Sequence, residues 1–417
     1  MVYRLVYGRA EEVVMPWKET KVMDQRLQFV SMYLTHHWTL AALCRQFAIS
    51  RPTGYKWISR YLEGGRSGLN DRSRRPHCHP RAIGEQVEHR IIRARLAHPH
   101  WGPRKLLAWL QRQRPGRSWP VASTIGAILQ RHGLSVPRRR RRKSPPYDQP
   151  FLGCEAANRV WSADFKGWFR TGDGTRCDPL TISDNHSRYL LRCQAVRHSD
   201  HDSVQPVFEA VFREYGLPEA IRTDNGTPFA TTTVGGLSRL SIWWLKLGIR
   251  PERIEPGQPQ QNGRHERMHR TLKRETASPP QATWRRQQKA FDTFRKEYNH
   301  QRPHEALANS TPAEHYQPSP RPYPLIVPEP TYPDDMALRW VKSQGDITWC
   351  NRHVYLSETL AGELVGLKQT DNDRWHIYFG PIKLAVLDSH NRCLIHLPRR
   401  SKNVRTSKDD APTSENV

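Results

Sequence analysis

The sequence predicts a multidomain protein with N-terminal all-α helix-turn-helix units, a central α/β domain with a mixed sheet, and a small C-terminal β-barrel. Three observations predict this fold class. Helical periodicity runs through the N-terminal third, strands and helices alternate through the middle third, and short strands follow a proline-rich segment. At 417 residues the chain is long enough for about two to four domains.

The composition narrows the class of partner. Lys and Arg number 66 against 40 Asp and Glu, a formal net charge of +26, which predicts a polyanionic partner. The sequence has no uncharged apolar run of about 18 residues. It shows no secretory signal, and its seven cysteines form no CxxC pair. We therefore expect a cytoplasmic protein with no membrane partner, zinc ribbon or disulfide framework.

Residues 20–65 predict a first helix-turn-helix domain. A helical period begins at Asp24, Thr39 can cap a second helix, and Ser50 can cap a third, whose first turn tolerates Pro52. An ordinary helical bundle is the alternative, and the basic composition favours a DNA-binding unit. The side chains of the third helix that we expect to contact DNA are Arg51, Thr53, Tyr55, Lys56 and Arg60.

Residues 81–136 predict a second helix-turn-helix domain. Its second helix opens at Trp101-Gly102-Pro103, followed by Arg104 and Lys105, which we expect to contact DNA. A basic linker over residues 137–150 follows, and its cations can neutralise backbone phosphates. These cations are Arg138, Arg139, Arg140, Arg141, Arg142 and Lys143. Upstream, His77-Cys78-His79 is too tightly spaced for one tetrahedral metal site, and we interpret it as part of a connector.

Residues 151–318 predict the α/β domain. Three strands are followed by a helix, and then strand, helix, strand and two helices, which favours a mixed sheet. The expected strands are Val160–Phe169, Leu180–Ser183, Tyr189–Val196, Ala220–Thr223 and Arg250–Ile254, and the expected helices are Val204–Tyr215, Leu237–Leu247, 260–275 and 283–299.

Three carboxylates in this domain are candidate catalytic and metal-binding groups. Asp164 lies inside an apolar strand, Asp224 follows a strand directly, and Glu266 lies on a helix. Acids that converge at strand ends suit Mg²⁺, and two such ions about 4 Å apart can promote phosphoryl transfer. Taken singly, each acid is more often structural, and Asp224 before Asn-Gly is also a turn signal. Asp184 is a rival acid at a strand end, where capping a turn is its plainer role.

The helix around Glu266 also carries basic residues that indicate contact with DNA. Glu266, His269 or Arg270, and Lys273 fall on one helical face. An acid flanked by cations is unusual in a core helix, and it is consistent with DNA phosphates along that face. A solvated amphipathic helix is the alternative.

The C-terminal part has three expected segments. Residues 319–335 are a proline-rich linker. Residues 336–398 have the short strands of a small β-barrel, including a hairpin turn at Asp371-Asn372-Asp373. Residues 399–417 are expected to be a disordered tail.

The motifs together resemble a known family. They are Asp164 in Trp161-Ser162-Ala163-Asp164-Phe165, Thr223-Asp224-Asn225-Gly226, and Q-N-G-R-x-E-R-x-H-R-T-L-K at 261–273. This set resembles the core of bacterial insertion-sequence transposases of the DDE, retroviral-integrase type. The resemblance covers most of the chain, and the segment Tyr298–Leu307 resembles the one that closes the family's core.

The resemblance implies an RNase H-like fold for the α/β domain. It implies that Asp164, Asp224 and Glu266 are catalytic ligands of two Mg²⁺ ions, with Mn²⁺ able to substitute. It also implies that Lys273 contacts transposon-end DNA, with Asn225 and His269 as helpers. The shared helical face adds Arg270 as a further expected DNA contact. Asp224 and Glu266 are separated by 41 residues, more than in the retroviral pattern, and the extra length falls near Thr231–Ser241.

The implied activity is DNA transposition. The helix-turn-helix units would bind terminal inverted repeats, and the core would cleave the element ends and join their 3′-hydroxyls to target DNA. The protein would bind double-stranded DNA, both the terminal inverted repeats and the target, as a homo-oligomer. It would be bacterial and nucleoid-associated. Two alternatives stay open: an RNase H-like nuclease that cuts without joining, and a transposase-derived regulator with an inactive core. The presence of all three acids disfavours the regulator.

Overall fold

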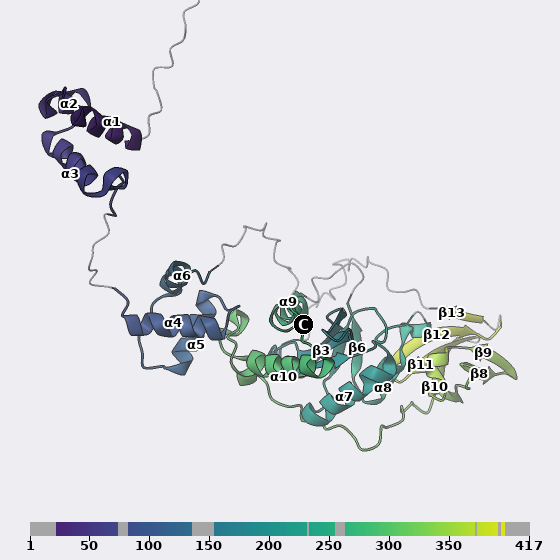
Figure 1. Ribbon diagram of the computed structural model, residues 1–417. Coiled ribbons are helices and arrows are strands. Elements are labelled where there is room, and N and C mark those ends of the chain that lie inside the picture. Colours follow the sequence, from purple (N-terminus) through teal and green to yellow (C-terminus); the bar gives the residue numbers. More distant parts are fainter. Residues whose placement is uncertain are drawn as a thin grey trace, which may run out of the picture. The chain divides into compact units, whose positions relative to one another are not determined.

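The computed structural model describes residues 22–73, 82–135, 154–231, 233–254, 263–371, 373–390 and 393–396 (Figure 1). The chain divides into two compact units, Met1–Ala82 and Ile83–Val417. The expected basic linker at 137–150 and the expected disordered tail at 399–417 lie outside the described residues. Among the helices that the structure describes, none is long and apolar enough to cross a membrane.

The described part of the first unit is a helix-turn-helix, as predicted. Its helices are α1 (Val22–Leu34), α2 (Leu40–Gln46) and α3 (Arg51–Gly68). Thr39 and Ser50 cap α2 and α3, because their hydroxyls accept from the backbone N–H groups of Ala42 and Thr53, each at 3.4 Å. α3 continues to Gly68, three residues past the expected end of the domain at residue 65, with a non-helical residue at Gly65.

The second unit begins with a second trihelical group, again as predicted. It consists of α4 (Glu85–Ala97), α5 (Pro103–Gln113) and α6 (Ala122–Arg131). Their apolar faces enclose a core that includes Ile91, Trp101, Leu106, Ile125 and Ile128. The burial of these five side chains explains why the helical period of the sequence was readable here.

The α/β domain has the mixed sheet that was predicted. Its described strands are β1 (Val160–Phe165), β2 (Phe169–Arg170), β3 (Arg176–Asp184), β4 (Leu190–Val196), β5 (Ala220–Thr223) and β6 (Arg250–Arg253). The order is β2-β3-β1-β5-β6, with β4 paired to β3. β1 is antiparallel to β3 and parallel to β5, and β5 is parallel to β6.

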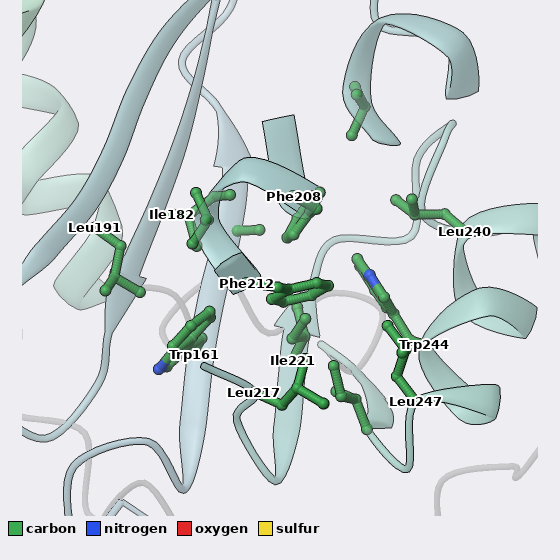
Figure 2. Packing of buried hydrophobic residues seen from close by; sticks show 14 of the residues in the cluster. Trp161, Ile182, Leu191, Phe208, Phe212, Leu217, Ile221, Leu240, Trp244 and Leu247 are labelled. Carbon is green, nitrogen blue, oxygen red and sulfur yellow. The ribbon is translucent and has the colours of Figure 1, made fainter. Parts of the chain in front are cut away.

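Helices cover both faces of this sheet. On one face, α7 (His201–Tyr215) and α8 (Arg239–Lys246) share a hydrophobic cluster with Trp161, whose ring stacks on Phe212 of α7. Figure 2 shows Phe208 and Phe212 of α7 between Trp161 and Trp244. On the other face, α9 (Gly263–Thr276) and α10 (Trp284–His300) pack with Met268, Leu272 and Phe291 against the sheet. Because strand side chains alternate, a residue of β1 meets either α7 and α8 or α9 and α10.

The proline-rich segment at 319–335 begins along the surface of the α/β domain. Arg321 donates to the carbonyl oxygens of Pro218 and Leu247, both at 2.9 Å, and its own carbonyl accepts from the N–H of Leu217 at 2.7 Å. Tyr323 also packs against the α7–α8 core. The segment that we expected to be a linker is therefore attached to the domain that it leaves.

The described C-terminal strands form sheets that are not closed, so the expected small β-barrel is not confirmed. The strands are β7 (Ala337–Trp340), β8 (Asp346–Trp349), β9 (Arg352–Tyr355), β10 (Leu364–Asp371), β11 (Arg374–Phe379), β12 (Ile382–Asp388) and β13 (Cys393–His396). The main sheet has the order β13-β12-β11-β10-β7, so β13 and β7 are edges, and β8 pairs with β9 separately.

A distant part of the chain packs against the C-terminal strands. The extra residues near Thr231–Ser241 include the short 3-10 helix η1 (Val234–Gly236). Val234, Leu237 and Ile242 share one hydrophobic cluster with side chains of the C-terminal sheet. Gly235 has a φ of 67°, and a Cβ there would lie 2.8 Å from Leu384, so the approach requires glycine. The extra residues near Thr231–Ser241 therefore pack on the C-terminal sheet.

Candidate active site

Asp164 and Asp224 lie at the same end of two neighbouring parallel strands. Ser162 of β1 is paired with Arg222 of β5, and two residues further along each chain are Asp164 and Asp224. The pairing of β1 with β5 ends at Ser162 and Arg222. Among the described residues, Asp164, Asp224 and Glu266 do not form a group whose carboxylate oxygens all lie within 4.8 Å of one another. The carboxyl ends of parallel strands are where open α/β sheets bind ligands.

Glu266 lies on the helix that crosses the same face of the sheet. Asp164 is paired with Thr181 of β3, and the Thr181 hydroxyl contacts His265 and His269 of α9. At 100° per residue, Glu266 lies about 60° around the helix from His269. Its side chain is exposed on the flank of α9, beside the buried face that contacts the sheet.

A hydrogen-bond network joins α9 to the strand that carries Asp164. The Thr181 hydroxyl donates to the Asp164 carbonyl at 3.0 Å and is 2.6 and 2.7 Å from the Nε2 atoms of His265 and His269. The Ser183 hydroxyl is 3.2 Å from Nδ1 of His265. Burial lowers the pKa of His265 to about 3 and, with His265 and Lys166 nearby, that of His269 to about 2. Both rings are therefore neutral at physiological pH.

Asp164, His265 and His269 form a group of potential metal ligands, of which His265 is already hydrogen-bonded through both ring nitrogens. One potential ligand atom from each lies within 4.8 Å of the other two. The sequence patterns did not single out His265, and they indicated a DNA contact for His269. The missed signal was the His-x-x-x-His spacing, which puts two imidazoles on one face of a helix.

Hydrogen bonds of the loop after β5 hold the carboxylate of Asp224 and the loop itself in place. The Gly226 N–H donates to the Asp224 carboxylate at 3.2 Å, and Asn225 donates to the carbonyl of Ile254 at 2.8 Å. Partial burial of the carboxylate raises the pKa of Asp224. Asn225, expected to help bind DNA, is exposed and anchors this loop to the end of β6.

The rival acid Asp184 has the structural role that was its plainer interpretation. It is buried and accepts from the N–H groups of Asn158 and Ser187 at 2.8 and 2.7 Å, and from the Ser187 hydroxyl at 2.6 Å. It is paired with Trp161, three residues before Asp164, and so lies toward the opposite end of β1. The hydrogen bonds fix the turn that follows β3.

The predicted DNA contacts on α9 are divided between its faces. Arg270 and Lys273 are exposed on the flank that also carries Glu266. His269 differs, because it is 6% exposed and contacts Thr181. Its direct contact with DNA stays a prediction.

The structure describes the residues of the two helical units that were predicted to contact DNA. On α3, Arg51, Tyr55 and Lys56 are exposed, and Thr53 and Arg60 are half-buried. On α5, Arg104 forms an ion pair with Glu305 at 3.1 Å. Lys105 is half-buried near Arg302, and burial followed by that positive charge lowers the pKa of Lys105 to about 8. The run from Arg138 to Lys143 lies outside the described residues.

Models of protein families match most of this architecture. Two models described as Integrase core domain match residues 155–259 and 247–312. A helix-turn-helix domain model matches residues 25–77, and a homeodomain-like domain model matches residues 53–129. The chain therefore combines helix-turn-helix DNA-binding domains with an integrase core.

Similar proteins come from mobile elements. A 31.7 kDa protein of insertion element IS407 from Burkholderia multivorans is 28% identical over 234 residues, covering 54% of this chain and 81% of that protein. A 39.2 kDa protein of insertion element IS476 from Xanthomonas euvesicatoria is 27% identical over 280 residues, covering 66% and 78%. The chain is therefore similar to proteins of bacterial insertion elements over most of their length.

Solved retroviral structures are also similar to this chain. A simian T-cell lymphotropic virus intasome is 17% identical, with a TM-score of 0.35, and the match covers 68% of this chain and 91% of that one. The HTLV-2 integrase catalytic core domain in complex with magnesium is 14% identical, with a TM-score of 0.31, covering 39% and 98%.

Proposed function

We propose that this protein is a DNA transposase that cleaves the ends of its element and joins the freed 3′-hydroxyls to target DNA. The observation that carries the proposal is the parallel pairing of β1, which carries Asp164, with β5, which leads directly to Asp224. The Thr181 hydroxyl connects the Asp164 carbonyl to α9, the helix that carries Glu266. The helix-turn-helix units of the same chain would bind the terminal inverted repeats, with α3 in the major groove.

The carboxylates suit two Mg²⁺ ions, with Mn²⁺ as a substitute. Asp164, Asp224 and Glu266 supply the hard oxygen ligands that these cations prefer, at a sheet edge where ligands bind. Bound there, the two ions would activate the attacking oxygen and stabilise the leaving oxygen of an in-line displacement. No covalent protein–DNA intermediate is expected, because water and the 3′-hydroxyl are the nucleophiles.

The chain's own residues would position the DNA. Arg270 and Lys273 are exposed on the flank of α9 that carries Glu266, so they would bind phosphates beside the reacting bond. Thr181 would hold the backbone of Asp164 in place through its 3.0 Å hydrogen bond. Two element ends must be joined together, so we propose a homo-oligomer on DNA, in the cytoplasm and associated with the nucleoid.

A strand-transfer assay tests this function. A labelled, pre-cut element end is mixed with plasmid target in Mg²⁺ or Mn²⁺, and we expect joined products that disappear without the metal. Glu266→Gln should reduce joining by more than about a hundredfold, because losing a ligand exceeds the effect of losing an outer partner. Binding of the end DNA should be retained.

The control variant and the products separate the alternatives. Glu219→Gln removes an exposed carboxylate just before β5, at its opposite end from Asp224, and should join DNA normally. Cleavage without joining would identify a nuclease in place of a transposase. Specific binding of the end with neither reaction would identify a regulator, and full joining by Glu266→Gln would remove Glu266 from the site.

A further inference from the structure

The Thr181 hydroxyl determines which nitrogens of two histidines carry hydrogen. A hydroxyl has one hydrogen and can accept twice. Its hydrogen goes to the carbonyl of Asp164 at 3.0 Å, since a carbonyl can only accept. The Nε2 atoms of His265 and His269, at 2.6 and 2.7 Å, must therefore both donate to the Thr181 oxygen.

The two histidines differ at their second nitrogen. In a neutral ring with hydrogen on Nε2, Nδ1 is an acceptor. Nδ1 of His265 accepts from the Ser183 hydroxyl at 3.2 Å. Nδ1 of His269 instead lies 3.9 Å from Oδ2 of Asp164, too far for a hydrogen bond. A lone pair of His269 therefore lies near a carboxylate oxygen with no hydrogen between the two atoms.

The geometry points to Nδ1 of His269 as a metal ligand that binds the same ion as Asp164. Two bonds of about 2.1 Å span up to about 4.2 Å, so a cation fits between atoms separated by 3.9 Å. The ion would be held by imidazole nitrogen together with carboxylate oxygen. This inference rests on the proposed function and adds a nitrogen ligand to its site.

The nitrogen ligand selects among metals. Imidazole is the preferred ligand of Zn²⁺, Cu²⁺, Fe²⁺ and Ni²⁺. Mn²⁺ prefers oxygen, as Mg²⁺ does, but as a transition-metal ion it accepts a nitrogen ligand more readily than Mg²⁺. We therefore expect the site to bind Mn²⁺ more tightly than an all-carboxylate site would, with a smaller benefit for Mg²⁺. Three carboxylates alone would not favour Mn²⁺ over Mg²⁺. A nitrogen ligand from His269 would raise the affinity for Mn²⁺ relative to that for Mg²⁺.

Pulsed electron paramagnetic resonance of Mn²⁺ bound to the full-length protein tests the ligand directly. We expect a ¹⁴N coupling that changes to the ¹⁵N pattern when histidine is labelled with ¹⁵N. His269→Gln should remove the coupling and weaken Mn²⁺ binding about tenfold, with a smaller change for Mg²⁺. Glutamine can keep a donor near the position of Nε2, so the hydrogen bond to Thr181 is retained.

His265→Gln is the matched control, since it changes the neighbouring buried imidazole, whose Nδ1 is bonded to Ser183. It should keep the nitrogen coupling. A wild-type spectrum without histidine coupling, or a coupling that survives in His269→Gln, would overturn the assignment. So would a coupling that only His265→Gln removes. The spectrum of the labelled wild-type protein tests for a histidine ligand even if either variant does not fold.

The outcomes are distinct from those of the proposed function. Metal-dependent joining without a histidine coupling would overturn the assignment of His269 as a ligand and leave the transposase proposal intact. A histidine coupling in a protein that joins no DNA ends would support the ligand assignment and contradict the transposase proposal.

Discussion

At the scale of residues, a side chain's surroundings change its role from the one its sequence position indicates. Lys105 was expected to contact DNA as an ordinary cation. In the structure it is half-buried beside Arg302, with its pKa lowered to about 8 by burial first and Arg302 second. An ammonium group kept in such a place reduces the stability of the folded chain while it is charged.

Lys105→Met should therefore stabilise the protein at neutral pH. The folded pKa of about 8 lies below the ordinary lysine pKa of 10.5, so the folded state binds fewer protons than the unfolded state between these values. The penalty is complete below pH 8 and fades as the pH rises toward 10.5. We expect a higher melting temperature for Lys105→Met at pH 7 and a smaller gain at about pH 10, measured by circular dichroism.

Lys289→Met supplies the comparison, because Lys289 is exposed on α10. It should give no gain that fades with pH. A melting temperature for Lys105→Met that stays equal to or below the wild type at pH 7 would contradict the assigned penalty.

At the scale of elements, α3 depends on close packing against α1 and α2. A Cβ added at Gly54 would lie 2.7 Å from the Cys44 sulfur and 3.1 Å from Phe29. In the same helix, a Cβ at Gly64 would meet Ser67 at 3.8 Å, an ordinary contact. Alanine substitutions at the two glycines therefore distinguish the effect of packing from the effect of helix propensity.

Gly54→Ala should destabilise α3 by about 1–3 kcal/mol, because overpacking outweighs the better helix propensity of alanine. Gly64→Ala should stabilise it by about 0.5–1 kcal/mol. Hydrogen exchange of the α3 amides in the full-length protein measures both. Equal protection in the two variants would show that Cys44 and Phe29 move aside without cost.

At the scale of the whole molecule, the C-terminal sheet and the integrase core share one hydrophobic cluster. Leu237, from the insertion between Asp224 and Glu266, is 4% exposed and belongs to this cluster. Lys246 of α8 adds ion pairs to Glu329 at 2.9 Å and Glu363 at 3.1 Å. The insertion therefore attaches the sheet to the domain that carries the candidate site.

Leu237→Ala should cost about 2–5 kcal/mol of unfolding free energy, since it leaves a cavity between two parts of the chain. Denaturant unfolding measures the loss, and we expect the core and the C-terminal sheet to be destabilised together. Leu325→Ala, at a side chain that is 97% exposed, should change the free energy by less than about 0.5 kcal/mol. A loss confined to the sheet would show that the two parts unfold independently.

The sequence by itself determined the features that depend on near neighbours. The caps at Thr39 and Ser50 act on backbone groups three residues away, so they could be predicted from the local sequence alone. The order of helices and strands followed from periodicity in the same way, as did the end of β5 next to Asp224. The mixed sheet and the two trihelical units were predictable on these grounds.

Only the tertiary structure decided what depends on distant partners. Thr181 and His269 are 88 residues apart in sequence, and no local pattern reveals that one hydroxyl orients both imidazoles of α9. The strands after 336 carried the pattern of a barrel, yet the described sheet has free edges at β13 and β7, and Val234, Leu237 and Ile242 join its hydrophobic cluster. Alternation along a strand shows that one face is buried, and it does not show which distant segment buries that face.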